Sequence, residues 1–168
     1  MTGPSPRVER PYTEDGYGIP NQLEGTLPWS WAEERLRDAP IYWVASVRPD
    51  GRPHVTPIWG VWVEDAFWME GGPRTRRFRN LGSNPAAVVT VERANDALIL
   101  EGDAELVTDL DEELIERLLA AYRKYLPTHG YQAERENWRA GIWRVSPRKV
   151  LGWSNFPADT TRWVFTDR

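Results

Sequence analysis

The chain of 168 residues is 40% hydrophobic and 27% charged, which is typical of one folded domain with a substantial core and not of a disordered segment. Its net charge of −4 argues against nucleic-acid binding, and the lack of a signal-peptide core or of an apolar run of about 18 residues predicts a cytoplasmic protein that does not associate with membranes. Because cysteine is absent, disulfides, thiolate metal sites and cysteine nucleophiles are excluded.

The first 28 residues are rich in proline, glycine and charge, and they predict an extended arm laid over the body or over a partner subunit. Residues 29–168 are expected to form a single domain. At its start, Ser30 is expected to cap a short helix over Trp31–Arg37, with Glu33 completing a capping box. Pro40 should end this helix.

The next region has the aromatic and β-branched residues of strands, separated by turn residues. Strands are expected at Ile41–Val47, Pro53–Val63 and Ala66–Glu70. The turns between them are expected at Pro49-Asp50-Gly51 and at Glu64-Asp65. This spacing predicts a meander of hairpins.

The rest of the chain alternates between helix and strand signals. A short helix is expected at Arg74–Leu81, and a longer one after a cap at Asp109 or Asp111, with one apolar face made by Leu114, Ile115, Leu118, Leu119 and Tyr122. Further strands are expected at Ala86–Val91, Leu98–Val107, Ile142–Val145, Lys149–Phe156 and Trp163–Phe165. Six or more strands with short helices predict a mainly β fold, a closed or split antiparallel barrel.

An arginine cluster is the first candidate site. No acidic residue occurs from Gly71 to Val91, while four arginines fall within six positions: Arg74, Arg76, Arg77 and Arg79. A Gly-Gly-Pro turn that enters a helix leaves backbone N–H groups free at the positive end of the helix dipole. With the guanidinium groups, these donors predict a phosphate site, although a solvated basic face remains the alternative.

The strand over Pro53–Val63 is the second candidate site. If it is extended, Val55, Pro57 and Trp59 share the face expected to join the core, and His54 and Thr56 lie on the face expected to meet a ligand. Pro57 removes a ladder donor and therefore predicts an edge strand. A half-exposed strand with no ligand is the alternative.

Several site classes have no support. Two histidines, His54 and His129, do not make a zinc site without suitably spaced carboxylates, so no metal site is expected. No nucleophile, P-loop or dinucleotide fingerprint is present, so no catalytic side chain is assigned. Ten tryptophans fit a core as well as a pocket for planar ligands, and Trp59, Trp62, Trp143 and Trp153 are candidates for the pocket.

The order of these features resembles a known family. The chain contains in order the hairpin PDGRPHVTPIW, the strand FWM, the basic segment RTRRFRNL, EGDAELVTD and KVLGWSNFP. Across residues 30–168 it resembles the pyridoxamine 5′-phosphate oxidase-like split β-barrel superfamily. The segment RRFRNLGSNPAAVVTVE is similar to the K/R-x-R-N-L-x-x-N-P-x-V signature of its flavin/deazaflavin (F-420) oxidoreductase branch.

This resemblance implies an antiparallel, Greek-key-like, FMN-binding split barrel that forms a homodimer with cofactor sites at the subunit interface. It implies phosphate contacts from Arg74, Thr75, Arg76 and Arg77. Contacts with the ring and ribityl chain would come from His54, Val55, Thr56, Pro57, Trp68, Met69 and Glu70, and from Trp153 of the partner subunit. The family often has lysine where this chain has Arg77, which leaves the choice between FMN and coenzyme F-420 open.

The implied function is hydride transfer between F-420 and a small planar conjugated substrate. Such a cofactor supplies the reactive chemistry, and the protein supplies position and electrostatics, in agreement with the missing catalytic constellation. An FMN-dependent oxidoreductase is the first alternative. A non-catalytic protein that binds a flavin-like or tetrapyrrole ligand is the second.

Overall fold

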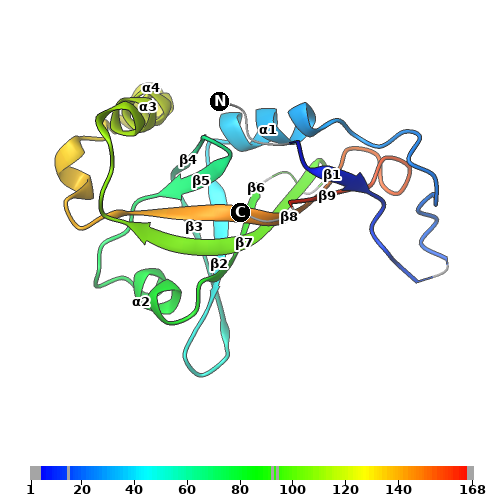
Figure 1. Cartoon of the computed structure of the whole chain (residues 1–168), viewed down its shortest axis with the longest axis horizontal. Helices are drawn as coiled ribbons and strands as arrows, with labels where there is room; N and C mark the ends of the chain where they lie inside the picture. The colour runs from blue at the N-terminus through cyan, green and yellow to red at the C-terminus, as the bar shows by residue number, and fades with distance from the viewer. Residues whose placement is uncertain (1–4, 15, 92, 94, 166–168) are drawn as a thin grey trace.

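The computed structural model describes residues 5–14, 16–91, 93 and 95–165. Its strands form one antiparallel sheet in the order β1-β9-β8-β7-β6-β2-β3, and β5 joins β4 to β8 (Figure 1). The strands are β1 (Arg7–Glu9), β2 (Tyr42–Val47), β3 (Pro53–Ile58), β4 (Gly60–Val63), β5 (Ala66–Met69), β6 (Ala86–Val91), β7 (Ala97–Val107), β8 (Ile142–Trp153) and β9 (Thr161–Val164).

The sheet divides along β8. The first half of β8 pairs with β5 and the second half with β9, while β7 pairs with β8 along its whole length. The division coincides with a bulge where Gly102 faces Pro147. A Cβ at Gly102 would lie 2.2 Å from the carbonyl oxygen of Ser146, so only glycine allows this close approach. The expected split antiparallel barrel is therefore confirmed, with a single bulged strand in place of the two expected over Ile142–Phe156.

The helices are α1 (Trp29–Asp38), α2 (Arg76–Ser83), α3 (Glu112–Tyr122) and α4 (Leu126–His129), with 3-10 turns η1 (Arg123–Tyr125) and η2 (Arg135–Trp138). They cover two hydrophobic clusters. One fills the barrel beneath α1, and the other lies between the β4–β5 hairpin and the segment from α3 to η2. No described helix is long and apolar enough to cross a membrane.

Helix α3 follows the sequence closely. Asp111 is its N-cap and accepts a hydrogen bond from the Leu114 backbone N–H at 2.8 Å. Ile115, Leu118 and Tyr122 are buried, as the apolar periodicity predicts.

The expected cap of α1 is wrong. Pro28, and not Ser30, occupies the N-cap, and no side chain caps the helix. The extended backbone at Pro28 (φ −70°, ψ 154°) starts the helix two residues earlier than expected, at Trp29. Trp29 then packs edge-on against Trp62, Trp163 and Phe165, with ring centroids 5.1–6.2 Å apart.

The expected strand Pro53–Val63 is divided into two. β3 pairs with β2, and the chain then leaves that ladder at Trp59 so that β4 pairs with β5. Tyr125 stabilises the break because its hydroxyl donates to the Gly60 carbonyl at 2.7 Å and accepts from the Gly60 N–H at 2.9 Å. The early strands thus make two separate hairpins and not a continuous meander. The Glu64-Asp65 turn is confirmed, and both residues have positive φ.

The expected core face of β3 is also wrong. Val55 is 56% exposed and Pro57 is exposed, while His54, Thr56 and Ile58 are half-buried. Ser46 explains the orientation: it pairs with His54 across the hairpin and accepts a buried hydrogen bond from Asn80 of α2. The even-numbered side chains therefore face α2. The prediction of an edge strand from Pro57 is confirmed, since β3 ends the sheet.

The N-terminal segment contributes β1, which pairs with β9. Arg10 continues this attachment by donating to four backbone carbonyls, those of Gln22, Glu24, Ala158 and Thr160, at 2.6–3.0 Å. One guanidinium therefore links the segment to the loop that precedes β9.

Candidate functional site

A cluster of basic side chains lies between the β2–β3 hairpin and α2, which are neighbours in Figure 1. Thr75 caps α2: its Oγ1 accepts from the Phe78 N–H at 3.3 Å and donates to the Gly72 carbonyl at 2.9 Å. This turn directs the first backbone N–H groups of α2 and the side chains of Arg76 and Arg77 to the same region.

Arg77 is the centre of this cluster. Its guanidinium donates to Thr56 Oγ1 at 2.9 Å and to the Glu70 carbonyl at 3.2 Å. Both acceptors are neutral, and no described carboxylate lies within ion-pair distance of it. A guanidinium has five N–H donors, so three remain for a ligand. Burial lowers the pKa of Arg77, which is the cost of holding a partly buried cation without an anion.

His54 and Arg48 complete the cluster. His54 Nδ1 and Arg48 Nε are buried and have no hydrogen-bond partner among the described residues. The pKa of His54 is lowered, first by burial and then by the charges of Arg48, Arg77 and Arg76. A buried guanidinium donor and a buried imidazole nitrogen without partners, beside uncompensated positive charge, are what a phosphate group would satisfy.

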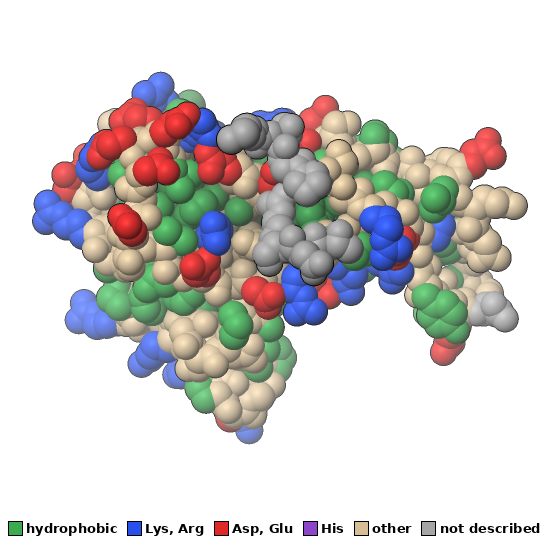
Figure 2. Space-filling view, in the orientation of Figure 1, with side chains coloured by type: hydrophobic (Ala, Val, Ile, Leu, Met, Phe, Trp, Pro, Cys, Tyr) green, Lys and Arg blue, Asp and Glu red, His purple; other side chains and the backbone are tan. Residues whose placement is uncertain are grey.

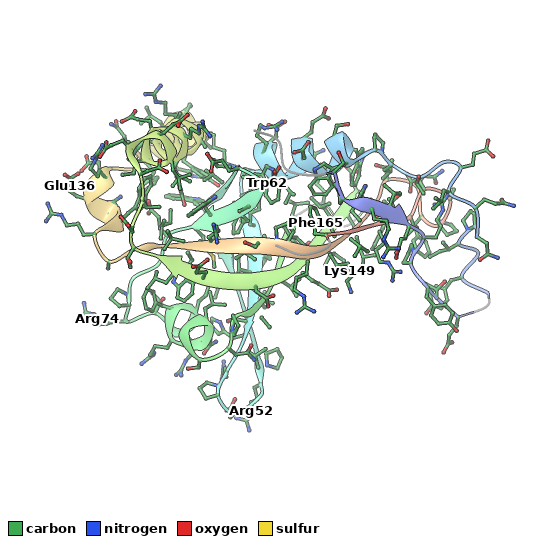
Figure 3. All side chains as sticks on the ribbon, in the orientation of Figure 1. Arg52, Trp62, Arg74, Glu136, Lys149 and Phe165 are labelled. Atoms are coloured by element: carbon green, nitrogen blue, oxygen red, sulfur yellow. The ribbon has the colours of Figure 1, made fainter. Side chains whose placement is uncertain are left out.

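The structure brings some of the expected site residues together and separates others. The residues that converge on the cluster are His54, Thr56, Arg76, Arg77 and the backbone of Glu70, with Thr75 at the helix cap. Arg74 is exposed beside the start of α2, where Figure 3 labels it. Val55 and Pro57 point to the opposite face of the sheet. The side chains of Trp68 and Met69 are buried in the two hydrophobic clusters, so only their backbone is free to meet a ligand. Trp153 ends β8, far along that strand from Trp143.

Sequence reasoning missed Arg48 and left Trp143 undecided among the tryptophans. Trp143 flanks Arg77: a Cβ at Gly71 would lie 3.6 Å from Arg77 Nη2 and 3.7 Å from Trp143 Cδ1. Trp143 Nε1 is another buried donor with no partner among the described residues. Arg48 could have been predicted from the sequence, because it lies in the same hairpin as His54. Trp143 could not, because its place beside Arg77 depends on the register of β8 in the sheet.

A cavity of about 380 Å³ lies beside the cluster. Glu70 joins the two, because its carbonyl accepts from Arg77 and its side chain lines the cavity. The other lining residues are Ile41, Pro57, Ile58, Trp59, Tyr122 and Tyr131. The walls are therefore mainly apolar and aromatic, as in sites for planar ligands.

A larger groove of about 1020 Å³ runs over the outer face of the sheet. Its floor combines small apolar residues of β2 and β6, such as Ala45 and Val88, with charged residues of both signs on β7 and β8. Figure 2 shows hydrophobic side chains exposed between α3 and the hairpin. Within the described ranges, no group of three His, Asp or Glu side chains could hold a metal ion.

Comparison with solved structures identifies the fold. An F-420 reductase is 24% identical, with a TM-score of 0.52 over 70% of this chain and 94% of its own. A FAD-binding protein from Mesorhizobium loti is 16% identical, with a TM-score of 0.57 over 83% and 96%. A heme storage protein from Vibrio cholerae is 20% identical, with a TM-score of 0.51 over 68% and 86%.

No curated protein matches the sequence. The family profile described as pyridoxamine 5′-phosphate oxidase, however, matches residues 31–154, from the third residue of α1 to the residue after β8. This match covers well over half of the chain and contains both the basic cluster and the aromatic cavity. The chain therefore belongs to the pyridoxamine 5′-phosphate oxidase family, with the split β-barrel fold.

Proposed function

We propose that this chain is an oxidoreductase that binds F-420 and transfers a hydride between this deazaflavin and a small planar conjugated substrate. The observation that carries the proposal is Arg77, a partly buried cation held by two neutral acceptors with three donors to spare. The cofactor's phosphate is the anion that would complete this arrangement. The F-420 reductase among the solved relatives favours F-420 over FMN. The RRFRNLGSNP segment is similar to a signature of the flavin/deazaflavin branch and fits either cofactor.

The residues present fit such a cofactor. Arg76 and Arg77 would bind the phosphate together with the free N–H groups at the start of α2. Arg48 Nε, buried and unpartnered, would gain an acceptor from it, and so would His54 Nδ1 once the imidazole is protonated beside the bound anion. Thr56, already fixed by Arg77, would orient the ribityl chain along β3.

The family fold supports a homodimer, with the cofactor at the interface. On the outer face of the sheet, Trp43 and Val55 are 37% and 56% exposed. Acidic residues of β7 lie beside basic residues of β8, as in the pairs Glu105–Arg144 and Lys149–Glu101. A surface that carries both charges beside apolar residues can pair with its own copy across a two-fold axis.

When bound, F-420 supplies the hydride, with both its electrons, at the deazaflavin ring. The chain would position the partners: the basic cluster would hold the phosphate end, and the aromatic wall of the cavity beside Glu70 would align a flat substrate. The accompanying proton is taken from solvent, so no side chain is assigned as general acid or base.

Two alternatives follow from the comparisons. The FAD-binding relative favours a flavin such as FMN in the same site, because the basic cluster would hold the phosphate of either cofactor. The heme storage relative favours a binder without turnover, because this fold accommodates a tetrapyrrole in that protein. Both are outcomes of the test below.

Parallel titration of the protein with F-420 and FMN tests the proposal, followed by the same titrations on the double variant Arg76→Ala/Arg77→Ala. Removal of two charge-assisted contacts is expected to weaken F-420 binding by about 2–4 kcal/mol. Single-turnover reduction of a quinone or enone by the reduced complex then separates an enzyme from a binder.

Arg52→Ala is the matched control. Arg52 lies at the tip of the hairpin, as Figure 3 shows, and pairs with Asp50 outside the cluster. The Arg52→Ala substitution removes one positive charge, and we expect it to have little effect on F-420 binding. Unchanged F-420 affinity in a folded double variant would contradict the assignment of Arg76 and Arg77 to the phosphate. If the parent protein binds FMN more tightly than F-420, FMN is the cofactor.

A further inference from the structure

The cavity beside the basic cluster has three aromatic side chains in its wall: Trp59 from the link between β3 and β4, Tyr122 from the end of α3, and Tyr131 from the connection between α3 and β8. Trp59 stacks on Tyr125 with ring centroids 5.3 Å apart and planes at 24°. Its ring also lies 5.0 Å from Tyr131 and 4.9 Å from His129. Rings fixed on several sides make a slot that suits a flat molecule, because little side-chain entropy is lost on binding.

One carboxylate lies in this aromatic wall. Glu70 Oε2 accepts from the Tyr131 hydroxyl at 2.6 Å, and Oε1 accepts from Trp138 Nε1 at 2.8 Å. Asn137 donates in turn to the Tyr131 oxygen at 3.0 Å. These hydrogen bonds fix the carboxylate in one orientation, and each of its oxygens keeps acceptor capacity.

The charge of Glu70 is not balanced by a cation. Its hydrogen-bond donors, Tyr131 and Trp138, are neutral, and no described Lys, Arg or His forms an ion pair with it. Arg77 contacts Glu70 through the main-chain carbonyl and not through the carboxylate. Once a cofactor phosphate binds Arg77, the carboxylate is the remaining charge that faces the cavity. A negative charge among aromatic rings attracts a cation and repels an anion.

We propose that this cavity is a substrate-selecting pocket, and that Glu70 favours planar rings with a positively charged, protonated nitrogen over neutral rings and excludes anionic ones. The rings supply the stacking surface, and the carboxylate supplies the charged acceptor at its edge. The inference rests on the proposed function for the role of the pocket in turnover. Binding to the pocket itself is measurable without any cofactor.

Three probes of nearly the same shape but different charge are compared: benzamidine is cationic, benzamide is neutral and benzoate is anionic. Differences in their affinities therefore report the effect of charge and not of shape. Their binding to the full-length, cofactor-free protein is measured by NMR or calorimetry in saturating inorganic phosphate, which is added to neutralise the basic cluster so that benzoate does not bind there. We expect the affinity order benzamidine, benzamide, benzoate. In Glu70→Gln, benzamidine is expected to lose about tenfold or more in affinity, the effect of one charge-assisted hydrogen bond, while benzamide changes little.

Two further variants make the outcome specific. Tyr131→Phe keeps the ring and the Glu70 charge, so it should preserve the preference for benzamidine even if the variant is less stable. Glu113→Gln removes an exposed carboxylate that pairs with Arg117 on α3, outside the pocket lining and the proposed dimer surface, and it should change nothing. A purely structural role of Glu70 would weaken all three probes equally.

The inference is overturned if benzoate binds as tightly as benzamidine, if Glu70→Gln affects the probes equally, or if benzamidine does not bind at millimolar concentration. These results are independent of the proposed function, which the F-420 and FMN titrations decide. If the protein binds benzamidine through Glu70 but binds neither F-420 nor FMN, the pocket proposal is supported and the proposed oxidoreductase function is wrong.

Discussion

At the scale of single residues, the site is defined by polar atoms that lack partners. A buried guanidinium or imidazole nitrogen without an acceptor costs free energy, and natural proteins keep few of them. Here Arg48 Nε, His54 Nδ1 and Trp143 Nε1 are all of this kind, and all lie on the side of the sheet that faces α2 or Arg77. Their clustering supports a bound anion more strongly than any of them would alone.

His54 gives a direct readout of that anion. Burial and three arginines lower its pKa below the ordinary value of 6.5. Between 6.5 and the lower folded value, the unfolded chain binds a proton that the folded chain does not, so stability is expected to fall as pH falls through this window. NMR titration, with His54 assigned by its absence in His54→Gln, should give a pKa below 6.5 that rises when F-420 binds. A pKa at or above 6.5 in the free protein would contradict the cationic cluster.

At the scale of elements, the break between β3 and β4 decides where the aromatic cavity lies. β3 stays with β2 at the edge of the sheet, while β4 turns away to pair with β5. A Cβ at Gly60 would lie 2.3 Å from the Phe67 ring, so only glycine fits at the crossing. Because Trp59 precedes this crossing, its ring is directed toward Tyr125 and the cavity.

Two tyrosines, Tyr122 at the end of α3 and Tyr125 in η1, test this account, because the change to Phe should have opposite effects on stability at the two positions. Tyr125→Phe leaves the buried N–H and carbonyl of Gly60 unpaired and should lower the free energy of unfolding by about 2 kcal/mol. Tyr122 is 1% exposed, and its hydroxyl has no hydrogen bond of normal geometry among the described residues. Tyr122→Phe should therefore raise stability by about 1 kcal/mol.

Urea unfolding of the two variants and the parent protein measures the difference. If both variants lose stability equally, the break at Gly60 does not depend on the Tyr125 hydroxyl in particular. Tyr122→Phe also removes no contact of the Glu70 carboxylate, so the order of probe affinities should persist in it.

At the scale of the whole molecule, the sheet has two faces with different tasks. The inner face and the helices bury the hydrophobic clusters, while the outer face carries the groove of about 1020 Å³ and the exposed Trp43 and Val55. Exposed aromatic and β-branched residues on an edge hairpin favour aggregation of a monomer. A second copy of the chain would bury them.

The homodimer proposal is tested by Val55→Asp. A charge on the exposed outer face of the edge hairpin should shift the protein from dimer to monomer in sedimentation velocity and weaken F-420 binding, since the proposed site is completed by the partner subunit. Leu126→Asp on α4 is the control, because Leu126 is similarly exposed but lies outside β3 and the groove. A dimer that survives Val55→Asp would place the interface elsewhere.

The sequence by itself determined what depends on local chemistry. Turn residues located the β2–β3 and β4–β5 hairpins, apolar periodicity and Asp111 located α3, and Pro57 identified an edge strand. The RTRRFRNL segment was found as a site candidate because a run of basic residues without acids is visible without a structure. His54 was found because side chains alternate along the expected strand. The order of these features also identified the family.

Only the tertiary structure decided which side of each strand faces the body. Alternation along β3 separates His54 and Thr56 from Val55 and Pro57 but does not say which pair is buried, and that depended on Asn80 of α2 bonding Ser46. The contact of Glu70 with Trp138 joins residues 68 positions apart. Such contacts are fixed by the packing of β5 and the α3–β8 connection, and no local pattern encodes them.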